Sequence, residues 1–416
     1  MAVGKTDIWV YAHWIGMSGP KCVGILSSQQ AKGRKAFSFE YNKEWIGSVA
    51  QFLLDPDIGW YSGGQFPNDK NNFGVFTDSM PDTWGRKLMQ RCASQKARED
   101  NKFTPNLYEI DFLLGVHDFT RMGALRFKLD PNGPFLDNDE SLPIPPWAHI
   151  RELQHSAEVF EEGSDRDNKK WLDMLIAPGS SLGGARPKAN ILDETGQLWI
   201  AKFPSKNDAT DKASWEYMAH RLALQCGVDM VECKIEKIHG KYQTFFTKRF
   251  DRQKSERIHF ASAMTMTGNH EDLIRDISPS YLEIAEFIQY SGVDIKTDLH
   301  QLWRRIIFNM TISNTDDHLR NHGFILSEKG WRLSPAYDLN PSIDKTGLSL
   351  NVDTDSNDLD FELAKSVGEY FQLKNSEMDT IISEVKAGTK NWRIIATELG
   401  ISRQEQELMS SAFLLA

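Results

Sequence analysis

The sequence predicts an α+β protein whose N-terminal part is an antiparallel, β-rich subdomain and whose C-terminal part is mostly helical. Three observations support this prediction. Short strand-like segments dominate residues 1–130, two hairpins with a helix between them occupy the middle, and apolar residues recur at helical spacing after residue 256. Because 416 residues is long for one core, we expect domains at 1–130, 131–255 and 256–416.

The composition is that of an ordinary soluble protein. Hydrophobic residues make up 40% and charged residues 25% of the chain, and the net charge of −10 argues against a dedicated nucleic-acid binder. The sequence has no apolar run of membrane-spanning length, no signal-peptide core and no metal-binding cysteine spacing. We therefore expect a cytoplasmic protein with reduced thiols and no membrane contact.

The N-terminal segment carries strand signals but no catalytic constellation. Its predicted strands are residues 7–11, 23–26, 36–41 and 123–127. Asp82 is placed to cap a helix with Arg86 one turn further on, and we interpret both as structural residues. We expect this segment to be a docking or regulatory domain, followed by a proline-rich linker at 140–146.

The stretch 178–188 is rich in glycine, which lets backbone N–H groups approach phosphate oxygens closely. Most glycine pairs only make turns. The stretch 178–188 differs from these because a hairpin over 189–203 follows it, as at the start of a kinase small lobe. The candidate nucleotide-binding residues of the stretch are Ser181, Leu182, Gly183, Gly184, Ala185 and Lys188.

Lys202 lies in the second strand of that hairpin and shares a face with Leu198 and Ile200. An ammonium group among aliphatic side chains needs an anion beside it. A nucleotide phosphate would serve, as would Glu216 on the helix predicted over 211–225. The alternative is a surface lysine whose stem lies along apolar surface. The glycine stretch before it favours a catalytic lysine that binds nucleotide.

A second hairpin is predicted over 231–237 and 242–250. An adenine ring would bond to the backbone near its end, where Lys248 and Phe250 lie. Phe250 is otherwise an ordinary core residue, so both interpretations stay open.

A strongly amphipathic helix over 299–313 leads to the most polar loop of the chain. Its apolar stripe consists of Leu299, Leu302, Trp303, Ile306, Ile307 and Met310. Asp316 and His318, the candidate catalytic residues, lie on the loop with Asn321, and a hairpin over 324–333 leads on to Asp338. Phosphoryl transfer needs such a set: one carboxylate orients or deprotonates the hydroxyl, and an amide and a second carboxylate hold magnesium.

Plainer interpretations exist for several of these polar residues. Most acidic loops are solvated turns or helix caps. His318 and His322 are four residues apart, but on a predicted loop, so a zinc pair is not expected. The acidic stretch 351–360 lacks the rest of a calcium loop, and two packed helices explain the segment 389–413 better than a DNA-reading motif does.

Four motifs, in this order, resemble the HipA family of bacterial serine/threonine protein kinases, which act as toxins of toxin–antitoxin modules. They are Gly183–Lys188, Arg249–Arg252, Asn314–Asn321 and Pro335–Asp338. The predicted N-terminal strands and Met80–Arg86 resemble the family's N-terminal domain, so the likeness covers nearly the whole chain. It implies a two-lobed, protein-kinase-like fold, shared with phosphatidylinositol kinases.

The resemblance implies the chemistry of the site as well. ATP and magnesium would be the cofactors, Asp316 the catalytic base, Asn321 and Asp338 the metal ligands, and Lys202 would contact the phosphates. It also implies autophosphorylation at Ser181 or its neighbour Ser180, where added negative charge would oppose nucleotide phosphates. The alternative is that these serines merely begin the loop.

The family's partners would be a translation-related protein substrate and a HipB-like DNA-binding antitoxin, with DNA contacted only through the antitoxin. Two departures keep the target open. The founding toxin's acidic segment after Arg252 is absent, and Asp317 stands where that toxin has glycine. Two rival functions are a phosphotransferase for a small molecule or lipid and a non-catalytic co-repressor scaffold.

Overall fold

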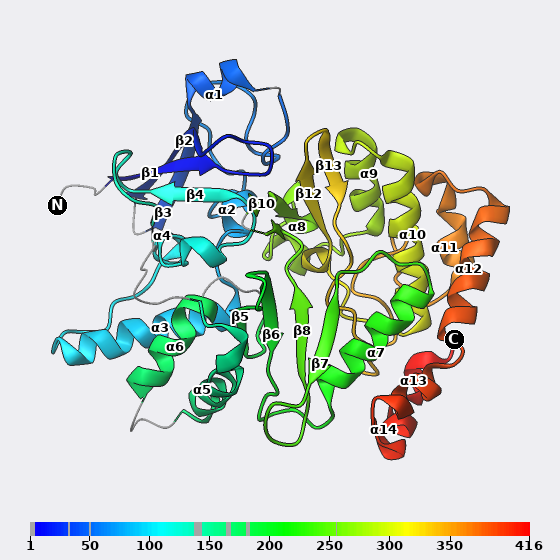
Figure 1. Cartoon of the computed structure of the whole chain (residues 1–416). Coiled ribbons are helices and arrows are strands. Elements are labelled where there is room, and N and C mark those ends of the chain that lie inside the picture. Colours follow the sequence, from blue (N-terminus) through cyan, green and yellow to red (C-terminus); the bar gives the residue numbers. More distant parts are fainter. Residues whose placement is uncertain are drawn as a thin grey trace. The chain divides into compact units, whose positions relative to one another are not determined.

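The computed structural model describes residues 5–31, 34–49, 51–136, 144–163, 168–179, 184–254 and 256–416 (Figure 1). These residues form two compact units. The first unit comprises the chain up to residue 207 together with 251–261, and the second comprises 208–250 and 262–416. The predicted three-domain division stays a prediction.

The first unit contains an antiparallel sheet with strand order β3-β2-β1-β4. Its strands are β1 (Lys5–Ala12), β2 (Lys21–Ala31), β3 (Arg34–Tyr41) and β4 (Leu125–Lys128). Ile8, Val10 and Ala12 of β1 are buried, as the period of two requires when one face covers a core. Three short helices complete this part: α1 (Lys43–Ser48), α2 (Gly74–Thr77) and α4 (Glu109–Leu114). The predicted antiparallel N-terminal sheet is confirmed.

The first unit also contains the short strand pair β9 (Arg252–Gln253) and β10 (Glu256–Arg257), three further helices and a hairpin. These helices and the strands of the hairpin are α3 (Thr83–Glu99), α5 (Ile150–Glu162), α6 (Asn168–Gly179), β5 (Lys188–Leu192) and β6 (Leu198–Lys202). Helix α3 lies alongside α6, which also packs on α5 and β5 (Figure 1). Residues 137–143 of the region around the predicted linker lie outside the described residues.

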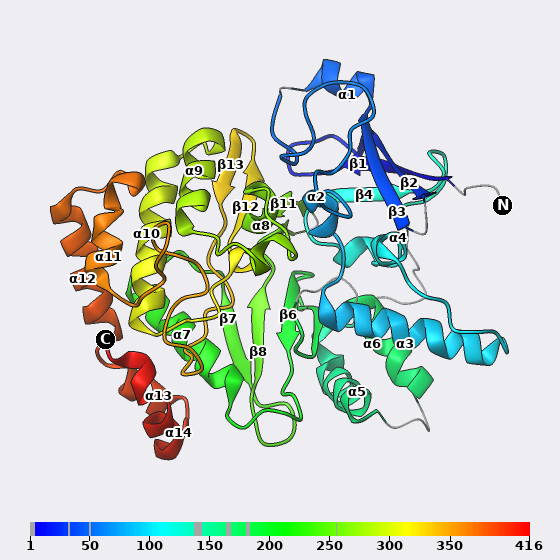
Figure 2. The same ribbon diagram turned by 180° about the vertical axis from the view of Figure 1, so that it is seen from behind.

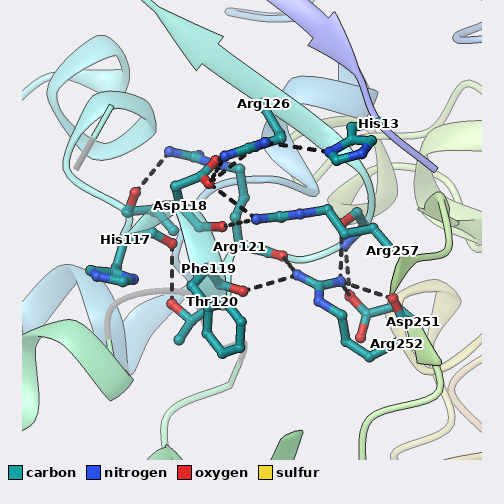
Figure 3. A network of polar contacts seen from close by, with 12 residues as sticks. His13, His117, Asp118, Phe119, Thr120, Arg121, Arg126, Asp251, Arg252 and Arg257 are labelled. Carbon is teal, nitrogen blue, oxygen red and sulfur yellow. Dashed lines mark hydrogen bonds and ion pairs between the residues drawn. The ribbon is translucent and has the colours of Figure 1, made fainter. Parts of the chain in front are cut away.

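A buried polar network holds residues 251–261 to the loop before β4 (Figure 3). Asp118, only 3% exposed, pairs with Arg126 at 2.6 Å and Arg257 at 3.2 Å. Burial alone would raise the pKa of the Asp118 carboxyl, but the two guanidinium groups hold it below its usual range. Asp251 accepts from the backbone N–H of Gly123 at 2.8 Å and from the Arg252 guanidinium at 2.7 Å. Two residues of the Arg249–Arg252 motif therefore have a structural role.

The second unit is mostly helical. Its hairpins are β7 (Cys233–Glu236) with β8 (Thr244–Lys248), and β12 (Gly323–Ser327) with β13 (Gly330–Leu333). Its helices are α7 (Lys212–Gln225), α8 (Ala263–Met266), α9 (Tyr281–Ser291), α10 (Ile295–Thr311), α11 (Phe361–Ser366), α12 (Asn375–Thr389), α13 (Trp392–Glu398) and α14 (Arg403–Leu408).

Helix α10 is the centre of that unit. It contacts α9, α11 and α12, and Figure 2 shows these helices around it. All six residues of the predicted apolar stripe are fully buried, so the predicted stripe is confirmed. The helix begins at Ile295, one turn before the predicted start, and ends at Thr311. Its rigid C-terminus therefore sets where the polar loop begins.

Candidate active site

The loop after α10 turns sharply and places two neighbouring aspartates in opposite environments. Ser313 takes a left-handed conformation, with φ of +50°, and the N–H of Asn314 donates to the Asn309 carbonyl at 2.8 Å. Asp316 is exposed, whereas Asp317 is 1% exposed. The loop thus presents one carboxylate to solvent and buries the next.

Three donors hold the Asp317 carboxylate. They are the Tyr281 hydroxyl at 2.5 Å, the Asn309 amide at 2.6 Å and the His322 Nε2 at 2.8 Å. Burial would raise the pKa of Asp317, but His322 and the Tyr281 hydrogen bond keep it below its usual range. All three groups donate to Oδ2 and so fix the backbone on which Asp316 stands. Oδ1 is buried without a hydrogen-bond partner among the residues that the structure describes.

Asn321 closes the loop on itself. Its Nδ2 donates to the backbone carbonyl of Asp316 at 3.0 Å, and its N–H donates to the His318 carbonyl at 2.8 Å. Because the amide nitrogen is committed to Asp316, the amide oxygen points away from that carbonyl and is suited to act as a ligand. The structure therefore brings Asp316, His318 and Asn321 together in one closed turn.

Tyr337 ties the segment carrying Asp338 to this turn. Its hydroxyl donates to the Arg320 carbonyl at 2.8 Å, and the N–H of Ala336 donates to the Asp229 carbonyl at 2.8 Å. Asp338 itself is exposed and has a φ of +58°. Such a conformation is uncommon for a residue with a side chain and is concentrated at functional sites.

The residues that follow β8 contact Tyr337 as well. The rings of Phe250 and Tyr337 stack with centroids 5.5 Å apart and planes 27° apart. Lys248, just before Phe250, pairs with Glu232 at 3.3 Å. Tyr337 thus contacts both the turn of Asp316 and the strand end predicted to hold adenine. The adenine contact itself stays a prediction.

Asn321 and Asp338 offer oxygen ligands of the kind that magnesium prefers. In the part of the chain that the structure describes, no group of three or more His, Cys, Asp or Glu side chains could hold a metal ion. Magnesium on nucleotide phosphates takes one or two protein ligands and completes its shell with phosphate and water. The two residues therefore fit a magnesium ion that arrives with a nucleotide.

In the first unit, Lys202 on β6 lies directly opposite Lys188 on β5. Lys188 is 8% exposed, and residues directly opposite in a hairpin project on the same face. Two like charges at this spacing repel each other. Two lysines on one face are compatible with an anionic ligand there, and their contact with nucleotide phosphates stays a prediction.

Other predicted residues are less constrained. Ser180, Ser181, Leu182 and Gly183 lie outside the described residues. Gly184 and Ala185 are exposed. Glu216 is buried on α7 in the second unit, whereas Lys202 belongs to the first, so the pairing of the two stays a prediction.

Sequence reasoning missed two residues that build the site. Asp317 was noted only as a departure from a related toxin, and Tyr337 was given no role. The signal for Tyr337 is its place between two motif residues, Ala336 and Asp338. Asp317 carries no such signal, because one of its donors, Tyr281, comes from α9, 36 residues earlier in the chain.

The fold and family were compared with known proteins. A family model described as "HipA-like C-terminal domain" matches residues 180–392, which is just over half of the chain. A solved structure described as "Shewanella oneidensis MR-1 Toxin Antitoxin System HipA, HipB and its operator DNA complex" matches with a TM-score of 0.65 and 17% identity, over 98% of this chain and 95% of that one. The predicted α+β, two-lobed kinase-like fold class is confirmed.

Curated relatives match over shorter stretches. A protein named "Putative kinase" from Haemophilus influenzae is 27% identical over 179 residues, which cover 38% of this chain and 52% of that protein. "Putative kinase Y4dM" from Sinorhizobium fredii is 29% identical over 160 residues, which cover 35% of this chain and 37% of that protein. The chain thus spans about half or less of these relatives.

Proposed function

The chain belongs to the family of HipA-like C-terminal domains, and we propose that it is an ATP- and magnesium-dependent serine/threonine protein kinase. The observation that carries the proposal is the closed turn after α10. There an exposed Asp316 stands on a backbone fixed by Asp317, and Tyr337 brings the Asp338 segment to the same turn. Oxygen ligands and a solvent-facing carboxylate so arranged suit phosphoryl transfer.

In the proposed reaction, a serine or threonine hydroxyl attacks the γ-phosphorus of ATP. The new P–O bond forms as the bond to the β-phosphate oxygen breaks, so ADP leaves and the hydroxyl proton passes to Asp316. Asn321 and Asp338 would hold magnesium, which neutralises phosphate charge when bound. Lys202 and Lys188 would hold the phosphates, and autophosphorylation at Ser181 or Ser180 belongs to the same proposal.

The toxin role and the partners are also proposals. The solved Shewanella complex contains HipA, HipB and operator DNA, which supports a HipB-like antitoxin for this chain and DNA contact through it. A translation-related protein is the proposed substrate and the cytoplasm the proposed location. In the residues that the structure describes, no helix has both the length and the apolar character needed to cross a bilayer.

The decisive test compares Asp316→Asn with the control Asp355→Asn, an exposed acid in the same unit. Labelled ATP is incubated with each protein and a cell lysate. Asp316→Asn should lower transfer by about 1,000-fold or more while its Kd for ATP stays within about threefold. The control should match the wild type.

Wild-type transfer by Asp316→Asn would refute the assigned role. A wild-type label that runs with lipid or a small molecule would support the first rival function. A magnesium-dependent thermal shift with ATP but no transfer at all would support the scaffold.

A further inference from the structure

We infer that Asp82 and Trp84, at the start of α3, are positioning residues that hold Gly184 and Lys188, in the described part of the glycine stretch. The inference rests on the proposed kinase function and extends it, because it gives the N-terminal part of the chain a role in binding nucleotide phosphates. The sequence alone had favoured a purely structural Asp82.

Both backbone groups of Gly184 are bound by the start of α3. Its N–H donates to Asp82 Oδ2 at 2.8 Å, and its carbonyl accepts from the N–H of Trp84 at 3.0 Å. Gly184 has a φ of +78°, which favours glycine. With both groups bound to one helix start, the peptide planes on either side of Gly184 are fixed in orientation.

Asp82 divides its two oxygens between two tasks. Oδ1 accepts from the N–H of Thr83 at 2.7 Å and so serves the helix, whereas Oδ2 serves Gly184. A capping residue needs only the first of these contacts. The second contact is therefore additional to a helix cap and is directed at the glycine segment.

Trp84 also binds the backbone at the start of β5. Its Nε1 donates to the Lys188 carbonyl at 2.8 Å, and a Cβ added to Gly179 would lie 3.3 Å from the same nitrogen. The indole is 2% exposed and packs edge-on against Phe160 with centroids 5.1 Å apart. A buried ring held by its neighbours therefore fixes the first residue of β5.

These contacts also set the position of the phosphate lysines. Lys188 begins β5 and lies opposite Lys202 of β6. The bond from Trp84 therefore fixes the strand that carries Lys188 and pairs with the strand that carries Lys202. Pre-organised binding groups lose less conformational entropy when a ligand binds. Loosening these contacts should therefore weaken binding of the triphosphate and leave binding of the nucleoside unchanged.

The test uses full-length protein and two conservative variants. Asp82→Ser keeps a helix cap but shortens the side chain that reaches Gly184, and Trp84→Phe keeps the ring but removes the Nε1 donor. The control is Arg86→Gln on the same helix, which breaks the pair with Glu109 of 2.7 and 2.8 Å and the bond to the Pro81 carbonyl of 3.0 Å but removes no bond to Gly184 or Lys188. Calorimetry measures binding of magnesium-ATP and of adenosine, and transfer assays give kcat and KM.

We expect both variants to raise the Kd and the KM for ATP about tenfold, with the Kd for adenosine and kcat changed by less than about threefold. Arg86→Gln should leave all four values within about twofold of the wild type. Unchanged ATP binding in folded variants would overturn the inference alone. An equal loss of affinity for adenosine, or the same loss of ATP affinity in Arg86→Gln, would also overturn the inference. If the wild-type protein does not bind ATP, the proposed function falls and the inference falls with it.

Discussion

Asp118 in the first unit and Asp317 in the second are both buried carboxylates, but different kinds of side chain donate to them. Asp118 is paired with two arginines, Arg126 and Arg257. Asp317 accepts from a hydroxyl, an amide and a histidine. Both carboxyl groups have a pKa below the usual range.

The difference follows from what each carboxylate supports. Guanidinium groups are permanently charged and bind in fixed geometry, which suits the network that joins residues 251–261 to the loop before β4. Next to Asp317 stands Asp316, which must accept a proton in the proposed reaction. The charge of the buried Arg305 also acts on Asp317, but the groups that donate hydrogen bonds to it are a hydroxyl, an amide and a histidine.

The largest expected effect separates the two carboxylates by activity. Asp317→Ala should lower kcat about 100-fold, because a shift of about 1 Å at the base can cost that much. Asp118→Ala should leave the kcat of the folded protein within about threefold of the wild type, since its network lies in the other unit. Transfer from labelled ATP measures both, and equal losses would remove the functional distinction.

Stability should respond strongly to Asp118. Its removal leaves the Arg126 and Arg257 guanidinium groups uncompensated, so Asp118→Ala should lower the free energy of unfolding by about 3–5 kcal/mol. Urea unfolding measures this loss. The exposed Asp130 of the same unit provides the control, and Asp130→Ala should change stability by less than about 0.5 kcal/mol. A comparable loss in both variants would argue against a network role for Asp118.

Tyr281→Phe tests the second network more finely. The substitution removes one of the three donors to Asp317 and keeps the ring, so we expect a loss of about 1.5–3 kcal/mol in the free energy of unfolding. Transfer should fall less than in Asp317→Ala, because two donors remain. Urea unfolding and kcat, measured together, check both statements. A variant as inactive as Asp317→Ala would show that the hydroxyl dominates the network.

The smallest expected effect is on acid stability. Because both carboxyl groups have a lowered pKa in the folded protein, the unfolded chain binds protons first, and stability falls as the pH drops below about 4. Asp118→Asn and Asp317→Asn should each flatten that fall. Asp55 should show the opposite dependence of stability on pH. Burial raises its pKa to about 6, so its contribution to the free energy of unfolding is lost as the pH rises towards 6. Urea unfolding between pH 3 and pH 7 checks the three slopes.

Several features of the site could be predicted because they depend on local spacing. The stripe of α10 follows from helical periodicity, and the polar residues after Thr311 had to form a loop at its end. Asp316, Asn321 and Asp338 were identified from the side-chain chemistry that phosphoryl transfer requires. The exposure of Asp316 and the closed turn around Asn321 agree with that interpretation, whereas their catalytic roles stay predictions.

Other features could not be predicted, because they join residues far apart in the chain. Asp82 looked like an ordinary helix cap until its second oxygen was found on Gly184, 102 positions away. Tyr337 acquired a role only through its bond to Arg320 and its stacking on Phe250. No periodicity or motif spacing encodes such contacts.

The amino-acid sequence by itself determined the fold class, the apolar face of α10 and the kinds of side chain at the site, since periodicity and chemistry are local properties. Only the tertiary structure decided which of two adjacent aspartates is buried. Burial depends on what surrounds a side chain, and the groups around Asp317 include Tyr281 of α9, a helix that only the folding of the chain brings to it.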